Sequence, residues 1–260
     1  MSKSPLVTYT RLSPNCTEGR TLNGKTYEID TVTIHCIVGQ WTAKQGCDFF
    51  SQASRQSSAN YVVGCDGSIG LCVEECNRSW CSGGKDKNGK PIYVNGISGK
   101  INDFRAITIE VASDTTHPYA VTDKALSALL DLLTDICKRN PGIGRLRWKG
   151  DKSLVGNLTE QNMTVHRWFA NKACPGDYLY ERHDQIAAEV NARLDALEKA
   201  STVDSTPADW EKPGVEFCTE NKIMVGDGKG DLMLHRPITR AEFCVMLKRY
   251  HDVFGPTKEL

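Results

Sequence analysis

The sequence carries no net charge and has no long apolar run, and each absence argues against a class of function. Lys and Arg total 32, as do Asp and Glu, so no overall positive field favours nucleic acid or an acidic membrane as the partner. The opening stretch MSKSPLVTYTRLSPN lacks the apolar core of an export signal, and nowhere do about 18 apolar residues follow one another. We therefore expect a protein that is made in the cytoplasm without a signal peptide and binds neither nucleic acid nor a membrane.

Cysteine, by contrast, is plentiful, with 11 residues. The count is odd and the chain is long for a disulfide scaffold, so we expect most cysteines to be buried thiols and one or two to be metal ligands. Cys72, Cys76 and Cys81 could form a second metal site, although their spacing fits no common zinc knuckle. With 40% apolar and 25% charged residues, the 260-residue chain predicts one large globular domain or a medium domain with a small appendage.

Two segments alternate apolar and polar residues and predict strands with one buried face. In TVTIHCIVG, Ile34 and Cys36 point toward the core and His35 points away from it. In RAITIEVAS, the isoleucines face the core and Glu110 lies opposite. NYVVGCDGSIGLCVEE predicts two strands around a Cys-Asp-Gly turn, and RLRWKG predicts a short strand. The glycine- and lysine-rich residues 82–101 predict an exposed loop.

Helical spacing of apolar residues predicts helices between these strands. Thr42 and Gln45 form a capping box that opens one helix, and a leucine-rich helix precedes the stop signal NPG. A further helix runs from about Asp184 to Lys199. Strands interleaved with helices predict an α/β fold with a central mixed β-sheet flanked by helices.

Composition changes toward the C-terminus. KASTVDSTPAD, residues 199–209, is small, polar and proline-containing, which predicts a linker between a main domain, 1–198, and a small helical module, 210–260. Within this module, Thr239 and Glu242 form a second capping box before apolar residues at helical spacing. About fifty residues with few apolar anchors bury little surface. We therefore expect the module to pack on a partner.

Three residues have the chemistry of a catalytic zinc site, which takes three His, Cys or carboxylate ligands and keeps one position for water. His35 lies on the polar side of a strand, and MTVHRWFANKACPGDYL places His166 and Cys174 eight residues apart. That separation lets the chain loop back to one ion. A histidine on a strand is more often a hydrogen-bonded structural residue, and this spacing alone is a weak indication of a metal site.

Glu110 strengthens the case for a metal. Its strand buries the neighbouring isoleucines, so the carboxylate is held on the polar face, where it could act as general base for a zinc-bound water. The alternative is an ordinary solvated glutamate on the face of a strand.

The segments TIHC, SANYVVGCDGSI, NDFRAITIEVA and VHRWFANKACPGDYL together resemble the zinc-dependent N-acetylmuramoyl-L-alanine amidases, the superfamily of phage endolysins, autolysins and peptidoglycan-recognition proteins. The resemblance runs from about residue 28 to residue 198. It implies a Zn²⁺ cofactor held by His35, His166 and Cys174, with Glu110 as the general base. It also implies that Lys172 is the cation that stabilises the oxyanion.

The same resemblance assigns Tyr61, Trp80 and Asn102 to the substrate groove. The sequence departs from the family in three places. Ala59 stands where some members carry a catalytic tyrosine, which argues against a tyrosine mechanism. Cys81 replaces the histidine of the motif A-W-H-A-G, and the glycine-rich loop that follows is longer than expected. These departures concern the shape of the groove and leave the metal ligands unchanged.

The C-terminal stretch resembles one surface-layer-homology repeat, with the signature NKIMVGDGKG followed by ITRAE. This implies that Trp210, Thr239, Arg240 and Glu242 bind a secondary cell-wall polymer. Such repeats usually occur in threes, so we expect the single copy to pack on its own domain or to form a homo-oligomer with the tails of other chains. The alternative is a small helical hairpin with a structural role.

The resemblance implies hydrolysis of the amide bond between N-acetylmuramic acid and L-alanine in cell-wall peptidoglycan. We expect a phage or prophage endolysin that reaches the wall after holin-type release. The alternatives are a bacterial autolysin, a muropeptide-recycling amidase and a non-catalytic peptidoglycan receptor. Receptors typically lack the zinc cysteine, which is present here as Cys174, and a wall-binding repeat has no use in a recycling enzyme.

Overall fold

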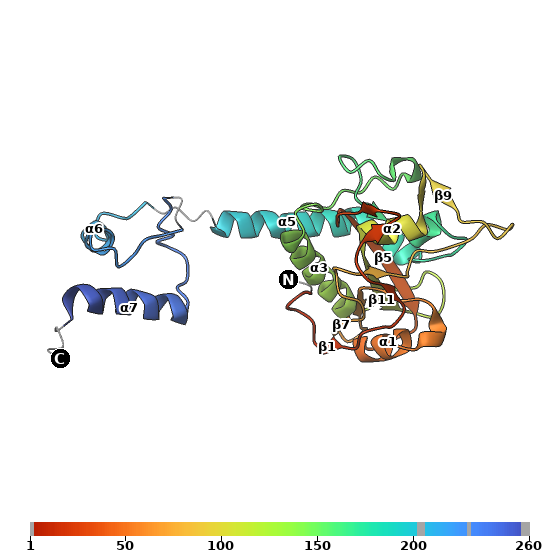
Figure 1. The fold of residues 1–260 in the computed structure, drawn as a ribbon, viewed down its shortest axis with the longest axis horizontal. Coiled ribbons are helices and arrows are strands. Elements are labelled where there is room, and N and C mark those ends of the chain that lie inside the picture. Colours follow the sequence, from red (N-terminus) through yellow and green to blue (C-terminus); the bar gives the residue numbers. More distant parts are fainter. Residues whose placement is uncertain (1–2, 202–205, 228–229, 256–260) are drawn as a thin grey trace. The chain divides into compact units, whose positions relative to one another are not determined.

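The computed structural model describes residues 3–201, 206–227 and 230–255 (Figure 1). The chain divides into two compact units, Met1–Leu194 and Asp195–Leu260. Part of the predicted linker, positions 228–229 of the repeat signature and the last residues of the C-terminal module lie outside the described residues. Among the residues described, no helix is both long enough and apolar enough to cross a membrane.

A six-stranded mixed sheet forms the centre of the first unit, in the strand order β1-β7-β6-β11-β5-β12. β5 (Thr31–Val38) and β11 (Ala106–Ser113) are its long central strands and pair in parallel over eight residues. β6 (Tyr61–Val63) and β7 (Ile69–Leu71) form the predicted antiparallel hairpin. The central strands are rich in β-branched residues, which suit a sheet that is buried on both faces.

The other elements are short strands and the helices that surround the sheet. The strands are β1 (Tyr9–Thr10), β2 (Cys16–Thr17), β3 (Thr21–Leu22), β4 (Lys25–Thr26), β8 (Arg78–Ser79), β9 (Tyr93–Val94), β10 (Ile97–Ser98) and β12 (Met163–Thr164). The helices are α1 (Ala43–Phe50), α2 (Gly99–Arg105), α3 (Asp123–Arg139), α4 (Asp177–Tyr180) and α5 (His183–Ser201), of which α5 begins in this unit and runs past its last residue, Leu194. Three 3₁₀ turns complete it, namely η1 (Ala53–Arg55), η2 (Lys152–Leu154) and η3 (His166–Trp168).

Helices cover both faces of the sheet. α3 and α5 pack on one face, where Leu129 and Val190 belong to the same apolar cluster as Ile34 and Ile109 of the central strands. α1 packs on the opposite face beside β6 and β7 through a smaller apolar cluster. On this second face, β5 and β11 carry polar side chains, and this is where the candidate site lies. The predicted α/β fold with a helix-flanked mixed sheet is confirmed.

Local signals placed the helix starts correctly. The side chain of Thr42 caps α1 and the Gln45 side chain returns the bond, so the predicted capping box is present. α5 begins one residue before the predicted start. In the second unit, Thr239 and Glu242 form the second predicted capping box at the start of α7 (Arg240–Phe254), which follows α6 (Lys212–Glu220).

The predicted strand at residues 145–150 is absent from the structure. Side-chain amides take the place of a neighbouring strand there: the backbone N–H of Arg147 donates to Asn162 Oδ1 at 2.8 Å, and that of Lys149 donates to Gln161 Oε1 at 3.1 Å. One backbone–backbone bond, from the N–H of Asn162 to the carbonyl of Arg147 at 3.2 Å, accompanies these amide contacts and is too little to make a strand ladder.

The predicted exposed loop at residues 82–101 also differs from the structure, since its second half is ordered into β9, β10 and the start of α2. Ser98 caps α2 by accepting the backbone N–H of Ile101. Gly99 begins the helix where the backbone of Ser82 passes so close that a Cβ at this position would collide with the Ser82 carbonyl oxygen. The glycine therefore lets the segment after β8 lie directly against α2.

Candidate functional site

His35 and Glu110 lie side by side on the two central strands. β5 and β11 are parallel and their register pairs these two residues, so both side chains leave the same face of the sheet. The alternate positions, Ile34 and Ile109, are buried in the core on the other face. His35 is completely buried, and Glu110, taken as a whole residue, is partly exposed. Strand alternation and register alone are enough to bring the pair together.

His166 and Cys174 reach the same place from the chain that follows β12. β12 pairs with β5 and thereby delivers η3 beside His35, with the ring centroids of the two histidines 5.1 Å apart. The backbone N–H of Arg167 donates to the carbonyl of Cys174 at 3.1 Å, which folds the intervening loop back on itself. As a result, Cys174 Sγ lies 3.4 Å from His35 Nδ1.

These three side chains form a donor set that fits a zinc ion. One ligand atom from each of His35, His166 and Cys174 lies within 4.8 Å of the others. Burial lowers the pKa of both imidazoles, and the charge of His166 lowers that of His35 further. Both rings are therefore held neutral, the form that ligates a metal. Two imidazole nitrogens and one sulfur, brought together from three segments, are ligands that zinc prefers.

Glu110 lies beside this donor set with an open oxygen. Burial raises the pKa of its carboxyl group to about 7, and the thiol of Cys81, whose Sγ lies 3.6 Å from Oε1, partly opposes that shift. Oε2 is buried and has no hydrogen-bond partner among the described residues. A carboxyl group balanced near neutral pH, with one oxygen free, is suited to accept and return a proton. Cys81, Glu110 and His35 also converge as a second group of potential ligands.

Asn102 lies beneath the site residues in a network of polar contacts that leads to His35. Its side-chain amide donates to Thr33 Oγ1 at 2.9 Å and accepts from Thr164 Oγ1 at 3.0 Å. Its Nδ2 lies 3.4 Å from Ser82 Oγ, which is itself 3.4 Å from His35 Nε2. Asn102 is almost fully buried, so we withdraw the prediction that it contacts substrate. Its influence on the site passes through Ser82, whose hydroxyl contacts His35 Nε2. Cys174 contacts the other ring nitrogen, Nδ1.

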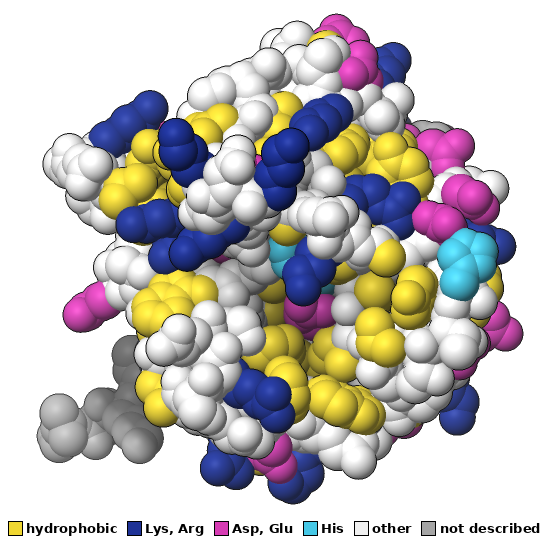
Figure 2. Space-filling model, turned by 90° about the vertical axis from the view of Figure 1, so that its right-hand side faces the viewer, with side chains coloured by type: hydrophobic (Ala, Val, Ile, Leu, Met, Phe, Trp, Pro, Cys, Tyr) yellow, Lys and Arg dark blue, Asp and Glu magenta, His cyan; other side chains and the backbone are white. Residues whose placement is uncertain are grey.

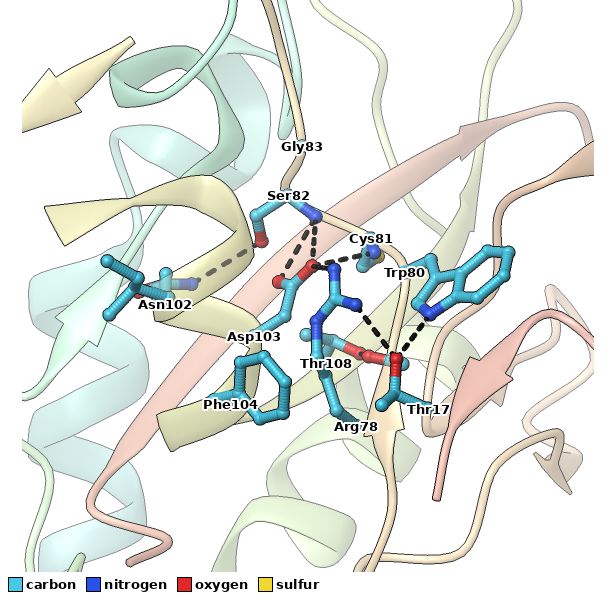
Figure 3. A network of polar contacts seen from close by, with 12 residues as sticks. Thr17, Arg78, Trp80, Cys81, Ser82, Gly83, Asn102, Asp103, Phe104 and Thr108 are labelled. Atoms are coloured by element: carbon cyan, nitrogen blue, oxygen red, sulfur yellow. Dashed lines mark hydrogen bonds and ion pairs between the residues drawn. The ribbon is translucent and has the colours of Figure 1, made fainter. Parts of the chain in front are cut away.

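Asp103 fixes the segment that carries Cys81 and Ser82 (Figure 3). Its buried carboxylate accepts the backbone N–H of Cys81 at 2.9 Å and that of Ser82 at 3.0 and 3.1 Å. The guanidinium of Arg78 lies 3.9 Å away. Burial raises the pKa of Asp103, whereas these contacts favour its charged form. Asp103 follows Asn102 in the sequence, but nothing in the local pattern indicated that its carboxylate holds a segment some twenty residues earlier.

Tyr61 and Trp80, which we predicted to bind substrate, have different positions. Tyr61 points into the core on the opposite face of the sheet, where its hydroxyl donates to Glu75 at 2.5 Å and accepts the backbone N–H of Ser4. It is fully buried, so we withdraw its predicted role. Trp80 is partly exposed, with its ring N–H donating to Thr17 Oγ1 at 2.9 Å, and its substrate role stays a prediction.

Lys172 is exposed on the loop between His166 and Cys174. Its charge contributes to lowering the pKa of His166, which places it within electrostatic reach of the site. Figure 2 shows a hollow on this face of the molecule, with histidine and acidic side chains at its floor and basic side chains along one side. A pocket adjoins the site through Gly83, whose carbonyl oxygen lies 3.4 Å from His166 Nε2, and is lined also by Gly84, Lys85, Pro91, Tyr93 and Lys100.

The cysteines are arranged differently from the sequence-based expectation. Cys36 packs partly against the core as predicted, but it is only half-buried. Burial raises the pKa of the Cys174 thiol well above its ordinary value, and the nearby Cys36 raises it further. Among the described residues, Cys81 converges with His35 and Glu110, whereas neither Cys72 nor Cys76 belongs to a converging ligand group. Cys76 is exposed and Cys72 is buried, so the suggested second site has no support.

The predicted wall-binding residues lie on the second unit. Trp210 is 82% exposed. Thr239 and Glu242 cap α7, and Glu242 also forms an ion pair with Arg236. Arg240 is the exposed first residue of that helix. Capping accounts for two of these residues, and the binding of a cell-wall polymer by all four stays a prediction.

Comparison with solved structures finds several that match more than two thirds of this chain. A selenomethionine derivative of AmpD is 20% identical, with 72% of this chain and 97% of that chain covered and a TM-score of 0.48. A mutant endolysin from Bacillus subtilis is 17% identical, with coverage of 71% and 99% and a TM-score of 0.45. The endolysin amidase LysCS from Clostridium intestinale is 14% identical, with coverage of 74% and 99% and a TM-score of 0.41.

The sequence itself gives the family assignment. No curated protein sequence matches the chain. The model of the N-acetylmuramoyl-L-alanine amidase family matches residues 25–177, more than half of the chain, and that range contains His35, Glu110, His166, Lys172 and Cys174. The chain therefore belongs to the N-acetylmuramoyl-L-alanine amidase family, whose substrate is bacterial cell-wall peptidoglycan.

Proposed function

We propose that the protein is a zinc-dependent hydrolase that cleaves the amide between the lactyl group of N-acetylmuramic acid and L-alanine of the stem peptide. The observation that carries this proposal is the convergence of His35, His166 and Cys174 within 4.8 Å, with an unpartnered oxygen of Glu110 beside them. Three protein ligands with an adjacent carboxylate are typical of metal-assisted hydrolysis.

The residues of the chain divide the chemical work. When bound, zinc supplies Lewis-acid activation of water and of the scissile carbonyl. Glu110 accepts a proton from the attacking water and returns it to the leaving amine, a role that suits a pKa of about 7. Lys172, on the exposed loop, supplies positive charge to the oxyanion as the substrate carbon becomes tetrahedral. The hydroxyl of Ser82, next to His35 Nε2, helps to orient the His35 ring.

Replacing Glu110 with glutamine tests the proposal. Glu110→Gln keeps the shape of the side chain and removes the base, so turnover should fall by about 10²-fold or more while bound zinc stays unchanged. Glu160→Gln is the matched control, because Glu160 is exposed in a turn of the same unit and belongs to neither converging ligand group. The measurements are amine release from purified cell walls and zinc content by elemental analysis. Near-normal turnover of a zinc-loaded Glu110→Gln protein would refute the assignment of the base.

Among amidases we favour an endolysin that reaches the wall after holin-type release, over an autolysin or a recycling enzyme. The support is the second unit, with its exposed tryptophan, which a cytoplasmic recycling enzyme does not need. A non-catalytic receptor is disfavoured by the complete donor set. A turbidity assay on cell walls, with free amines and reducing ends measured separately, distinguishes these functions. Binding without amine release would indicate a receptor, and release only from small muropeptides would indicate a recycling enzyme.

We further propose that the second unit binds the wall, through a secondary cell-wall polymer, and associates with the same unit of other chains. In the described part of this unit, Phe243, Leu247 and Tyr250 are each about half exposed, which leaves an apolar face on α7. Self-association would raise avidity for the wall without any new contact. A chain truncated after Lys199 should keep zinc and the cleavage of soluble muropeptides, but bind whole walls less well. Unchanged wall binding and unchanged mass in solution would refute both parts.

A further inference from the structure

Two cysteines outside the metal site lie in direct contact. Cys47 is on the inner side of α1, and Cys72 directly follows β7. Their sulfur atoms are 3.1 Å apart, and both side chains are completely buried. A disulfide bond has a length of about 2.05 Å, so a movement of about 1 Å would bring the two sulfurs to bonding distance.

The surrounding packing holds the Cys47 sulfur over the sheet next to Cys72. A Cβ at Gly70 would collide with Cys47 Sγ, so the missing side chain of this glycine makes the room that the sulfur fills. Ile37, Phe50 and Val62 complete the apolar cluster around the pair. The close approach is therefore built by residues of α1, β5, β6 and the hairpin around β7.

Neither cysteine belongs to the proposed hydrolytic machinery. The converging ligand groups of the described residues include neither Cys47 nor Cys72. Their sulfur atoms contact each other. A small apolar side chain at either position would fill the cluster equally well, so packing alone does not require two cysteines here.

We propose that Cys47 and Cys72 are a disulfide-forming pair that closes when the protein folds in an oxidising environment. The two thiols lose two protons and two electrons to a small-molecule disulfide, which is reduced to two thiols, and the exchange proceeds through one mixed disulfide. The new bond joins α1 to the end of β7. The loop that it closes contains β6, which pairs with β11, the strand that carries Glu110.

The bond would stabilise the first unit without altering its chemistry. It closes a loop between positions 25 residues apart. By the chain-entropy relation, a loop of this length lowers the unfolding equilibrium constant by about 10²- to 10³-fold. Contact with Cys47 and burial also raise the pKa of the Cys72 thiol well above its ordinary value. Exchange is therefore slow in the folded protein, and the test must allow the pair to react while the chain refolds.

The experiment uses the full-length protein, unfolded in urea and refolded with a mixture of oxidised and reduced glutathione. Remaining thiols are blocked with iodoacetamide in denaturant, and the protein is digested without reduction and analysed by mass spectrometry. We expect one linked pair of peptides that contain Cys47 and Cys72, absent after reduction. We also expect the oxidised protein to unfold at higher urea concentration than the reduced protein.

Two variants separate this pair from the other thiols. Cys47→Ala should lose the linked peptides and the oxidation-dependent gain in stability. Cys137→Ala removes another buried cysteine, on α3, and should keep both. If Cys47→Ala does not fold, the peptide map of the wild-type protein decides alone. Alkylation of both Cys47 and Cys72 after oxidative refolding, or a stability gain that persists in Cys47→Ala, would overturn the proposal.

Discussion

His183 makes the stability of the first unit dependent on pH. The residue begins α5 and is completely buried, with its Nδ1 donating to the carbonyl of Leu179 at 2.7 Å. Its ring lies 4.5 Å from that of Trp148, and its Nε2 has no hydrogen-bond partner among the described residues. Burial lowers the pKa of His183 to about 4, with a smaller contribution from the charge of Arg167, while the Leu179 carbonyl and Asp184 oppose the shift.

The sign of the effect follows from comparing the folded and unfolded states. An unfolded histidine has a pKa of about 6.5, so between that value and about 4 the unfolded chain binds a proton that the folded chain does not. Stability is therefore full above about pH 6.5 and falls as the pH falls. A difference of about 2.5 pKa units corresponds to about 3 kcal/mol in total, of which about 2 kcal/mol is lost between about pH 7.5 and pH 5.

Urea unfolding followed by tryptophan fluorescence at several pH values tests this reasoning. His183→Gln keeps a hydrogen-bond donor but cannot be protonated, so the variant should lose about 2 kcal/mol less than wild type over that pH range. His251→Gln is the control, because His251 is exposed on the second unit. The other buried groups titrate alike in both proteins and cancel in the difference. Parallel pH profiles for wild type and His183→Gln would refute the argument.

Three further substitutions test other parts of the structure. Cys174→Ser should abolish zinc retention by elemental analysis, whereas Cys65→Ser, which changes a cysteine at the hairpin turn outside the donor set, should not. Lys172→Ala should lower kcat by about 10²-fold with zinc retained, because charge stabilisation is lost in the transition state; an effect on KM alone would contradict this role. Gly70→Ala forces a Cβ against Cys47 and should cost about 1–3 kcal/mol in urea unfolding. Gly83→Ala, which meets open space, should be near neutral, and equal stabilities would disprove the packing argument.

Local sequence signals determined the central strands, several helices and half of the candidate site. Alternation in β5 and β11 placed His35 and Glu110 on polar faces, and both capping boxes marked true helix starts. These signals are reliable because strand alternation and helix capping depend only on residues a few positions apart. The family resemblance then named His166 and Cys174, which spacing alone left undecided.

Local patterns failed where the outcome depends on contacts between distant segments. Tyr61 lies in a strand whose three residues are all buried, so alternation could not say which face it takes. The sequence pattern of residues 145–150 predicted a strand. In the structure the segment bonds to amide side chains, such as that of Asn162, in place of a partner strand.

The sequence by itself determined the two central strands, the hairpin beside them, the main helices and the types of the candidate ligands, because each follows from periodicity, capping or side-chain chemistry. Only the tertiary structure decided that Asp103 holds the segment of Ser82, that Asn102 supports His35 from beneath, and that Cys47 contacts Cys72. Each of these contacts joins residues that are neither strand neighbours nor one helical turn apart. They form because parallel pairing of β5 and β11 and the packing of α1 and α2 on one face fix which side chains meet.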